Sequence, residues 1–157
     1  MARQFELIFT KRNVRGVATL LEEEAPLTCE AFWNALPLEG DAYHARWAGR
    51  EVYTLVGPFE TDPGVENATI LPISGDLLYF ELNPASIDIP PERRTGERII
   101  DIALFYGRNN FLLGPEGYAA GNLFATITEN LEGLAEACES IWREGFVGER
   151  MLLRRVE

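Results

Sequence analysis

The sequence predicts a mostly β protein, in which about eight strands form a closed or nearly closed antiparallel barrel and two helices plug it. Several segments alternate apolar and polar residues as strands do. Most of these segments follow one another at hairpin spacing, and two other segments carry apolar residues at helical spacing. The chain has 157 residues and shows no repeat or linker, so we expect residues 1–157 to form a single domain.

A hairpin opens the chain. Within residues 4–10, Phe5, Leu7 and Phe9 fall on one face and polar residues on the other, which is strand periodicity. Residues 11–13 are a short polar turn, and residues 14–21 return as the second strand.

The first helix follows this hairpin. Thr28 is a suitable capping residue, and Pro37 ends the helical pattern. One apolar face is formed at helical spacing by Cys29, Phe32, Trp33 and Leu36.

The middle of the chain alternates strands with loops. Residues 43–47 and 51–56 form a second hairpin around a turn at 48–50. The apolar runs at 77–82 and 99–106 predict buried strands. The loops expected around them cover residues 57–75, 83–98 and 107–122.

The second helix and two strands complete the fold. Residues 123–127 predict a strand, the helix is expected to start at Thr128, and Gly145 is a natural C-terminal cap. Residues 151–156 form the last strand. The helix presents one apolar stripe, made of Leu131, Leu134, Cys138, Ile141 and Trp142.

The composition leaves few groups for chemistry. The chain has one His, two Cys and a net charge of −11. A zinc site with several His or Cys ligands cannot be built, so we expect neither a metal nor a cofactor. Binding to nucleic acid is disfavoured because it needs basic surface. With no signal peptide and no apolar stretch of membrane-spanning length, we expect a cytoplasmic protein that does not contact membranes.

The order of elements resembles that of cyclophilins. Residues 26–36 (PLTCEAFWNAL) are similar to the first cyclophilin helix, and residues 43–46 (YHAR) occupy the place of its F-H-R strand. Residues 75–80 (GDLLYF) and 124–134 (FATITENLEGL) resemble a G-D strand and the closing strand-to-helix corner. The whole is most similar to a bacterial family of unknown function with a cyclophilin-like fold. This resemblance implies a closed eight-stranded antiparallel β-barrel capped by two α-helices.

The resemblance carries over one residue of the cyclophilin catalytic set, Arg46, whose counterpart donates to the twisted amide during prolyl isomerisation. The following residues, WAGREVY at 47–53, lack the P-G-F-M-x-Q-G-G run, and residues 120–123 contain no His. These departures argue against prolyl isomerase activity, and the sequence does not decide whether the chain is an enzyme. An Arg on a strand is also often a surface residue that pairs with an acid.

Polar residues at strand ends indicate a binding site. Residues 105–110 (FYGRNN) run from a buried strand into a loop that offers a phenol, a guanidinium and two amides, although Gly and Asn are also ordinary turn residues. Tyr53, Tyr79 and Tyr118 are candidates for an aromatic lining, and Asp101 needs a partner within its apolar strand. The candidate ligand-binding residues are Arg46, His44, Tyr53, Tyr106, Arg108 and Asn109.

Three functions remain open at this level. The first is binding of a small molecule or peptide in a pocket at the barrel surface, with an anionic or amide group facing these donors. The second is a prolyl isomerase-like enzyme that uses Arg46. The third is a structural or subunit-interface role, in which the acidic loop at 57–75 contacts a partner or a second copy in a homo-oligomer.

Overall fold

The computed structural model describes residues 1–87 and 89–156 and confirms a mostly β fold with two α-helices, α1 (Pro26–Ala35) and α2 (Leu131–Glu144). Neither is long and apolar enough to cross a membrane. A short 3-10 helix, η1, covers Pro91–Arg93. The strands are β1 (Gln4–Phe9), β2 (Val14–Leu20), β3 (Leu38–Asp41), β4 (Tyr43–His44), β5 (Glu51–Val56), β6 (Ala68–Thr69), β7 (Asp76–Leu82), β8 (Ile99–Phe105), β9 (Leu113–Gly114), β10 (Gly117–Tyr118), β11 (Gly121–Glu129) and β12 (Arg150–Arg155).

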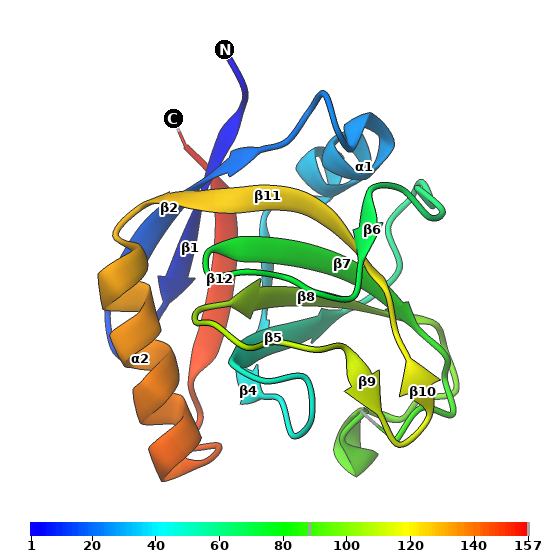
Figure 1. The fold of residues 1–157 in the computed structure, drawn as a ribbon, viewed down its shortest axis with the longest axis vertical. Helices are drawn as coiled ribbons and strands as arrows, with labels where there is room; N and C mark the ends of the chain where they lie inside the picture. The colour runs from blue at the N-terminus through cyan, green and yellow to red at the C-terminus, as the bar shows by residue number, and fades with distance from the viewer. Residues whose placement is uncertain (88, 157) are drawn as a thin grey trace.

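One antiparallel sheet contains most of these strands. Its order is β3-β12-β1-β2-β11-β7-β8-β5-β4, with the short β6 added beside β11. Strands β9 and β10 form a separate two-stranded hairpin. The sheet curls strongly, and α1 and α2 lie at different sides of it (Figure 1).

The expectation of a closed eight-stranded barrel is wrong. The described residues form twelve strands, and no backbone ladder among them joins β3 to β5. The two strands nevertheless touch, because a Cβ on Gly40 would lie 2.3 Å from Oγ1 of Thr54 and 3.1 Å from the carbonyl oxygen of Leu55. That carbonyl accepts a hydrogen bond of 3.0 Å from Nη2 of Arg93. A side chain from the η1 segment therefore bonds to the backbone of β5 beside β3, where no ladder forms between the two strands.

The interior of the curled sheet is a packed apolar core, to which both helices contribute. The rings of Phe5 and Phe124 each lie with their centroids 4.7 Å from that of Phe32 on α1. Cys29 and Cys138 are buried and free, as the sequence predicts for small core residues. Burial raises the pKa of the Cys29 thiol to about 12, which leaves it unreactive near neutral pH.

Several element boundaries differ from the sequence prediction. The strand expected over residues 43–47 ends at His44, and β3, β6, β9 and β10 were not predicted. Thr128 belongs to β11, and Asn130 caps α2 instead, with its Oδ1 accepting from the N–H of Gly133 at 3.3 Å. Trp142 does not join the buried stripe of α2, because its side chain is 61% exposed.

A second apolar layer covers the outer face of β4, β5, β8 and β7, the face turned away from the main core. Two smaller clusters lie there, one built around Phe80 and Phe105 and the other around Leu55 and Ile89. The described residues of 83–98 and the β9–β10 hairpin with its flanking residues provide the cover. Figure 1 shows β4, β9 and β10 together in the lower part of the view, away from α1.

Candidate binding cavity

A cavity of about 770 Å³ lies in this second layer, between the outer face of the sheet and its covering segments. This volume is typical of small-molecule sites. Its walls come from the turn after β4, the loop around η1, the β9–β10 hairpin and the C-terminal end of α2. The residues of its floor are Glu51, Tyr53, Phe80, Leu82 and Asp101.

Strand register determines how the floor is arranged. Tyr53 on β5 lies opposite Tyr43 and Ala103, so its side chain points to the outer face with theirs. Glu51 precedes Tyr53 by two residues and shares that face. Asp101 lies opposite Leu55, two residues after Tyr53. Tyr53 is therefore flanked along the sheet by two carboxylates, although Glu51 is only 6% exposed and Asp101 only 7%.

The walls are rich in aromatic rings. The centroid of Tyr43 lies 5.7 Å from that of Tyr53 and 5.1 Å from that of Phe146, which follows α2. Trp47 and Trp142 also line the cavity and are exposed. Of the three tyrosines proposed as a lining, only Tyr53 takes part.

Tyr79 and Tyr118 lie elsewhere. Tyr79 is buried against Phe59, with centroids 5.5 Å apart, and Tyr118 is exposed and stacks on Phe111.

Arg46 lies in the wall of this cavity and is exposed. In the strand predicted over residues 43–47, alternation would put Arg46 and Trp47 on opposite faces. The strand instead ends at His44, and both residues line the cavity. Within residues 1–87 and 89–156, Arg46 has no hydrogen bond or ion pair, whereas Arg98 pairs with Asp62 at 3.0 Å. In a chain with 25 acidic residues, this leaves a guanidinium available to a ligand.

His44 borders the cavity in a fixed tautomer. Its Nδ1 lies 2.8 Å from the carbonyl oxygen of Ala45, which can only accept, so Nδ1 carries the proton. Its Nε2 therefore accepts from the Tyr106 hydroxyl at 2.7 Å. Burial lowers the pKa of His44, although the bond to Ala45 opposes this effect. Burial also raises the pKa of Tyr106 to about 12, so both groups are neutral near pH 7.

Three of the predicted binding residues, Tyr106, Arg108 and Asn109, lie outside the cavity lining. Arg108 and Asn109 are exposed on the turn after β8, where Asn109 has φ 66°. The neighbouring Asn110 is buried and holds this turn, since its Nδ2 donates to the carbonyl oxygens of Gly107 at 2.8 Å and Pro72 at 3.0 Å. Its Oδ1 accepts from the N–H of Arg50 at 2.9 Å. The FYGRNN string therefore supports the wall of the site through Asn110.

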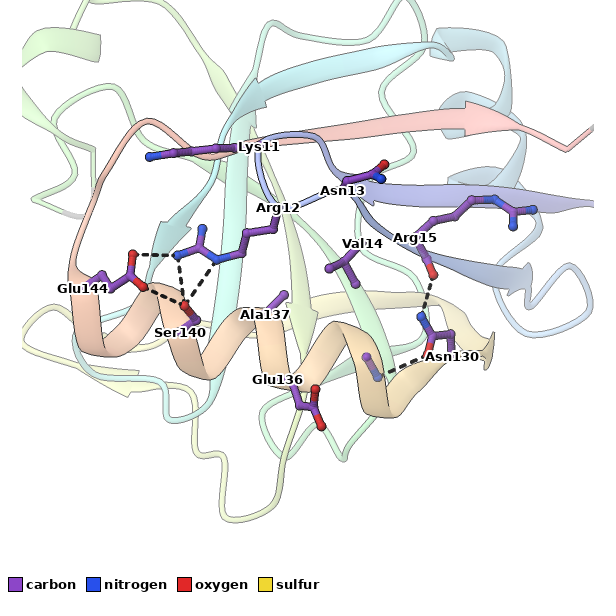
Figure 2. Close-up of a pocket in the computed structure, with 11 residues that line it drawn as sticks. Lys11, Arg12, Asn13, Val14, Arg15, Asn130, Glu136, Ala137, Ser140 and Glu144 are labelled. Carbon is purple, nitrogen blue, oxygen red and sulfur yellow. Dashed lines mark hydrogen bonds and ion pairs between the residues drawn. The ribbon is translucent and has the colours of Figure 1, made fainter.

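A shallower depression lies between the β1–β2 turn and α2 (Figure 2). Arg12 reaches across it to the Ser140 hydroxyl at 3.1 Å and to Glu144 at 3.1 Å, and it also pairs with Glu149 at 3.0 Å. Figure 2 also shows Asn130 joining the carbonyl of Arg15 to the start of α2. The polar groups of this depression are already bonded to one another. Their bonds attach α2 to the β1–β2 hairpin, so we assign them a structural role.

The described residues contain no group of three His, Cys, Asp or Glu side chains close enough to hold a metal ion. The fold and site thus define a curled antiparallel sheet protein with a covered cavity on its outer face. Residues 7–153 match the model of the family described as "Protein of unknown function (DUF3830)". The chain belongs to this family.

Two of the solved structures that are similar to this chain illustrate its fold. The structure of McbB in complex with tryptophan has a TM-score of 0.67 at 17% identity over 96% of this chain, which corresponds to only 44% of McbB. The solution structure of the hypothetical protein AF2241 from Archaeoglobus fulgidus has a TM-score of 0.52 at 22% identity, covering 99% of this chain and 95% of that one. At these identities the likeness concerns the fold alone. No curated protein is similar enough in sequence to count as a relative.

Proposed function

We propose that this protein binds a small molecule or a peptide in the cavity above β4, β5, β7 and β8. The observation that carries the proposal is Arg46, whose guanidinium lies in the wall of an aromatic-lined cavity and has no hydrogen bond or ion pair among the described residues. A ligand would place an apolar body against Tyr43, Tyr53 and Phe146 and direct a polar group to Arg46.

The similar structure of McbB was solved with tryptophan, a ligand that combines an aromatic ring with charged groups. A ligand of that kind suits this cavity, which also joins aromatic and charged side chains. The proposal keeps the cyclophilin-like architecture, with the site on the outside of the curled sheet, and a bacterial cytoplasmic setting.

A pair of neighbouring alanines allows a matched test. Ala119 and Ala120 are both exposed, but only Ala119 lines the cavity. A fragment library screened by ligand-observed NMR should give hits that Ala119→Trp abolishes, because the indole fills the cavity, and that Ala120→Trp retains. Hits that survive Ala119→Trp, or a library without hits, would contradict the proposal.

Prolyl isomerisation is a second candidate, which one observation favours: Arg46 borders a cavity with apolar walls, as an amide-twisting donor would. A protease-coupled assay with a prolyl peptide distinguishes the two functions. Binding without catalysis predicts the uncatalysed rate, whereas an accelerated rate that Arg46→Gln removes would establish the enzyme.

A further inference from the structure

We propose that the ligand of this cavity is a zwitterion, specifically an aromatic α-amino acid. The inference rests on the proposed function, because it specifies the ligand of the same cavity. It depends on the opposite charges that the fold brings to the floor and to the wall of one cavity.

The floor is acidic. Glu51 and Asp101 are almost completely buried, lie on the same face of the sheet, and flank Tyr53 along the strand direction. Both carboxylates have interactions within the protein, and a carboxylate, with about four acceptor positions, commonly bonds to several donors at once. An ammonium group carries three donors and would bind to such a floor as a charge-assisted partner.

The wall provides the complementary charge. Arg46 lies in the turn directly after β4, and this turn is held next to the floor, since the N–H of Ala45 donates to the carbonyl oxygen of Glu51 at 2.9 Å. A guanidinium fork binds a carboxylate through two parallel hydrogen bonds. The cavity thus offers a cation within a short stretch of chain from a buried carboxylate.

A ligand with a single charge fits this arrangement poorly. Two further lining residues, Glu92 and Arg94, carry opposite formal charges that offset each other. A simple anion would bind Arg46 but approach the two buried carboxylates of the floor, which repel it. A simple amine would satisfy the floor and leave Arg46 unused. A molecule that carries an ammonium and a carboxylate on one carbon satisfies both, and the net charge of −11 disfavours a ligand with excess negative charge.

The remaining surface of the cavity suits an aromatic side chain. Tyr43, Tyr53 and Phe146 form a continuous group of rings with centroid separations of 5.7 and 5.1 Å. These separations fall within the range of favourable aromatic contacts, so a further ring can pack edge-to-face or offset against them. The cavity volume of about 770 Å³ accommodates a two-ring side chain.

Three ligands that share one ring system test this inference on the unmodified chain. Isothermal titration calorimetry at pH 7 would compare L-tryptophan with tryptamine, which lacks the carboxylate, and with indole-3-propionate, which lacks the amine. We expect L-tryptophan to bind, and each analogue to bind at least about tenfold more weakly, because each loses a hydrogen bond to a charged group.

Each outcome separates this inference from the proposed function. If either analogue binds as tightly as L-tryptophan, the zwitterion inference fails while binding in the cavity stands. If none of the three binds, the inference fails too, and the fragment screen with Ala119→Trp decides the proposed function independently.

Variants identify the groups involved. Arg46→Gln should remove the preference for L-tryptophan over tryptamine. Glu51→Gln should remove the preference for L-tryptophan over indole-3-propionate. Arg143→Gln and Glu97→Gln change exposed residues outside the cavity lining and should leave both preferences unchanged. If Glu51→Gln does not fold, as circular dichroism would show, Arg46→Gln and the wild-type comparison still decide the inference. Unchanged preferences in Arg46→Gln would overturn it.

Discussion

Replacing Glu149 by Ala should destabilise the protein more than any change to a surface ion pair. Glu149 is 1% exposed, and its Oε1 accepts from the backbone N–H groups of Lys11 and Arg150, each at 2.8 Å. Its Oε2 accepts from the N–H of Arg12 at 3.1 Å and from Nη1 of the same residue at 3.0 Å. The carboxylate therefore joins the β1–β2 turn to the start of β12.

The expected loss of unfolding free energy depends on which partners the donors of Glu149 keep after the substitution. Removing one partner of a buried ion pair costs about 3–5 kcal/mol, and here three backbone donors also lose their acceptor. Arg12 keeps Ser140 and Glu144, which places the expected loss near the lower end of this range. At about 2–4 °C per kcal/mol for a chain of this size, a loss of about 3 kcal/mol should lower the Tm by roughly 6–12 °C.

Urea and thermal unfolding followed by circular dichroism measure this loss. Glu144→Ala is the matched control, because Glu144 pairs with the same Arg12 but its side chain is 55% exposed, and an exposed pair contributes about 0–1 kcal/mol. A Glu149→Ala protein whose stability lies within about 1 kcal/mol of wild type would refute the reasoning.

Three further predictions concern other parts of the fold. Burial raises the pKa of Glu66, but hydrogen bonds from Thr28 and Leu27 outweigh this effect, so the folded pKa lies below the usual 4.5. The ionised group therefore stabilises the fold above pH 4.5, and this contribution is lost as the pH falls through the lower folded pKa. Glu66→Gln should reduce the stability at pH 7 and flatten the dependence of stability on acid pH in urea titrations. His44, the single histidine, should titrate below 6.5 in NMR experiments and carry its proton on Nδ1. Gly40→Ala should cost about 1–3 kcal/mol by overpacking against Thr54, and Thr54→Ala should restore most of that loss.

Each of these has a result that would contradict it. For Glu66 it is an unchanged acid profile, and for His44 a pKa at or above 6.5 or a proton on Nε2. For Gly40 it is a double variant no more stable than the single one, since the contact at 2.3 Å would then not be the source of the strain.

Much of the fold could be predicted from local patterns. Phe5, Leu7 and Phe9 alternate in the sequence and are all fully buried in β1. Alternation and apolar runs report which face of a strand is buried, and that information is local. Closure of the sheet is not local, because it depends on how β3 and β5, which are separated along the chain, meet across the sheet.

The site was predictable only in part. His44, Arg46 and Tyr53 line the cavity, and Tyr106 bonds to His44. The turn geometry that directs Arg108 outward was not readable from the sequence.

Other lining residues were missed because they come from distant segments. Glu51 gave no signal on its own, since an acidic residue at the start of a strand is ordinary. Phe146 was missed because nothing in the sequence indicates that the end of α2 lies next to β4. Trp142 was assigned to the buried stripe because helical spacing does not report that α2 ends at the mouth of a cavity.

The central claim is that the cavity above the outer face of the sheet is the binding site. Amide chemical-shift mapping of the ¹⁵N-labelled chain with its highest-affinity ligand tests this most directly. The account predicts that the largest shifts fall on residues 43–53, on residues 87 and 89–94, and on residues 112–119. Shifts centred on the depression between the β1–β2 turn and α2, at Arg12 and Ser140, would contradict it.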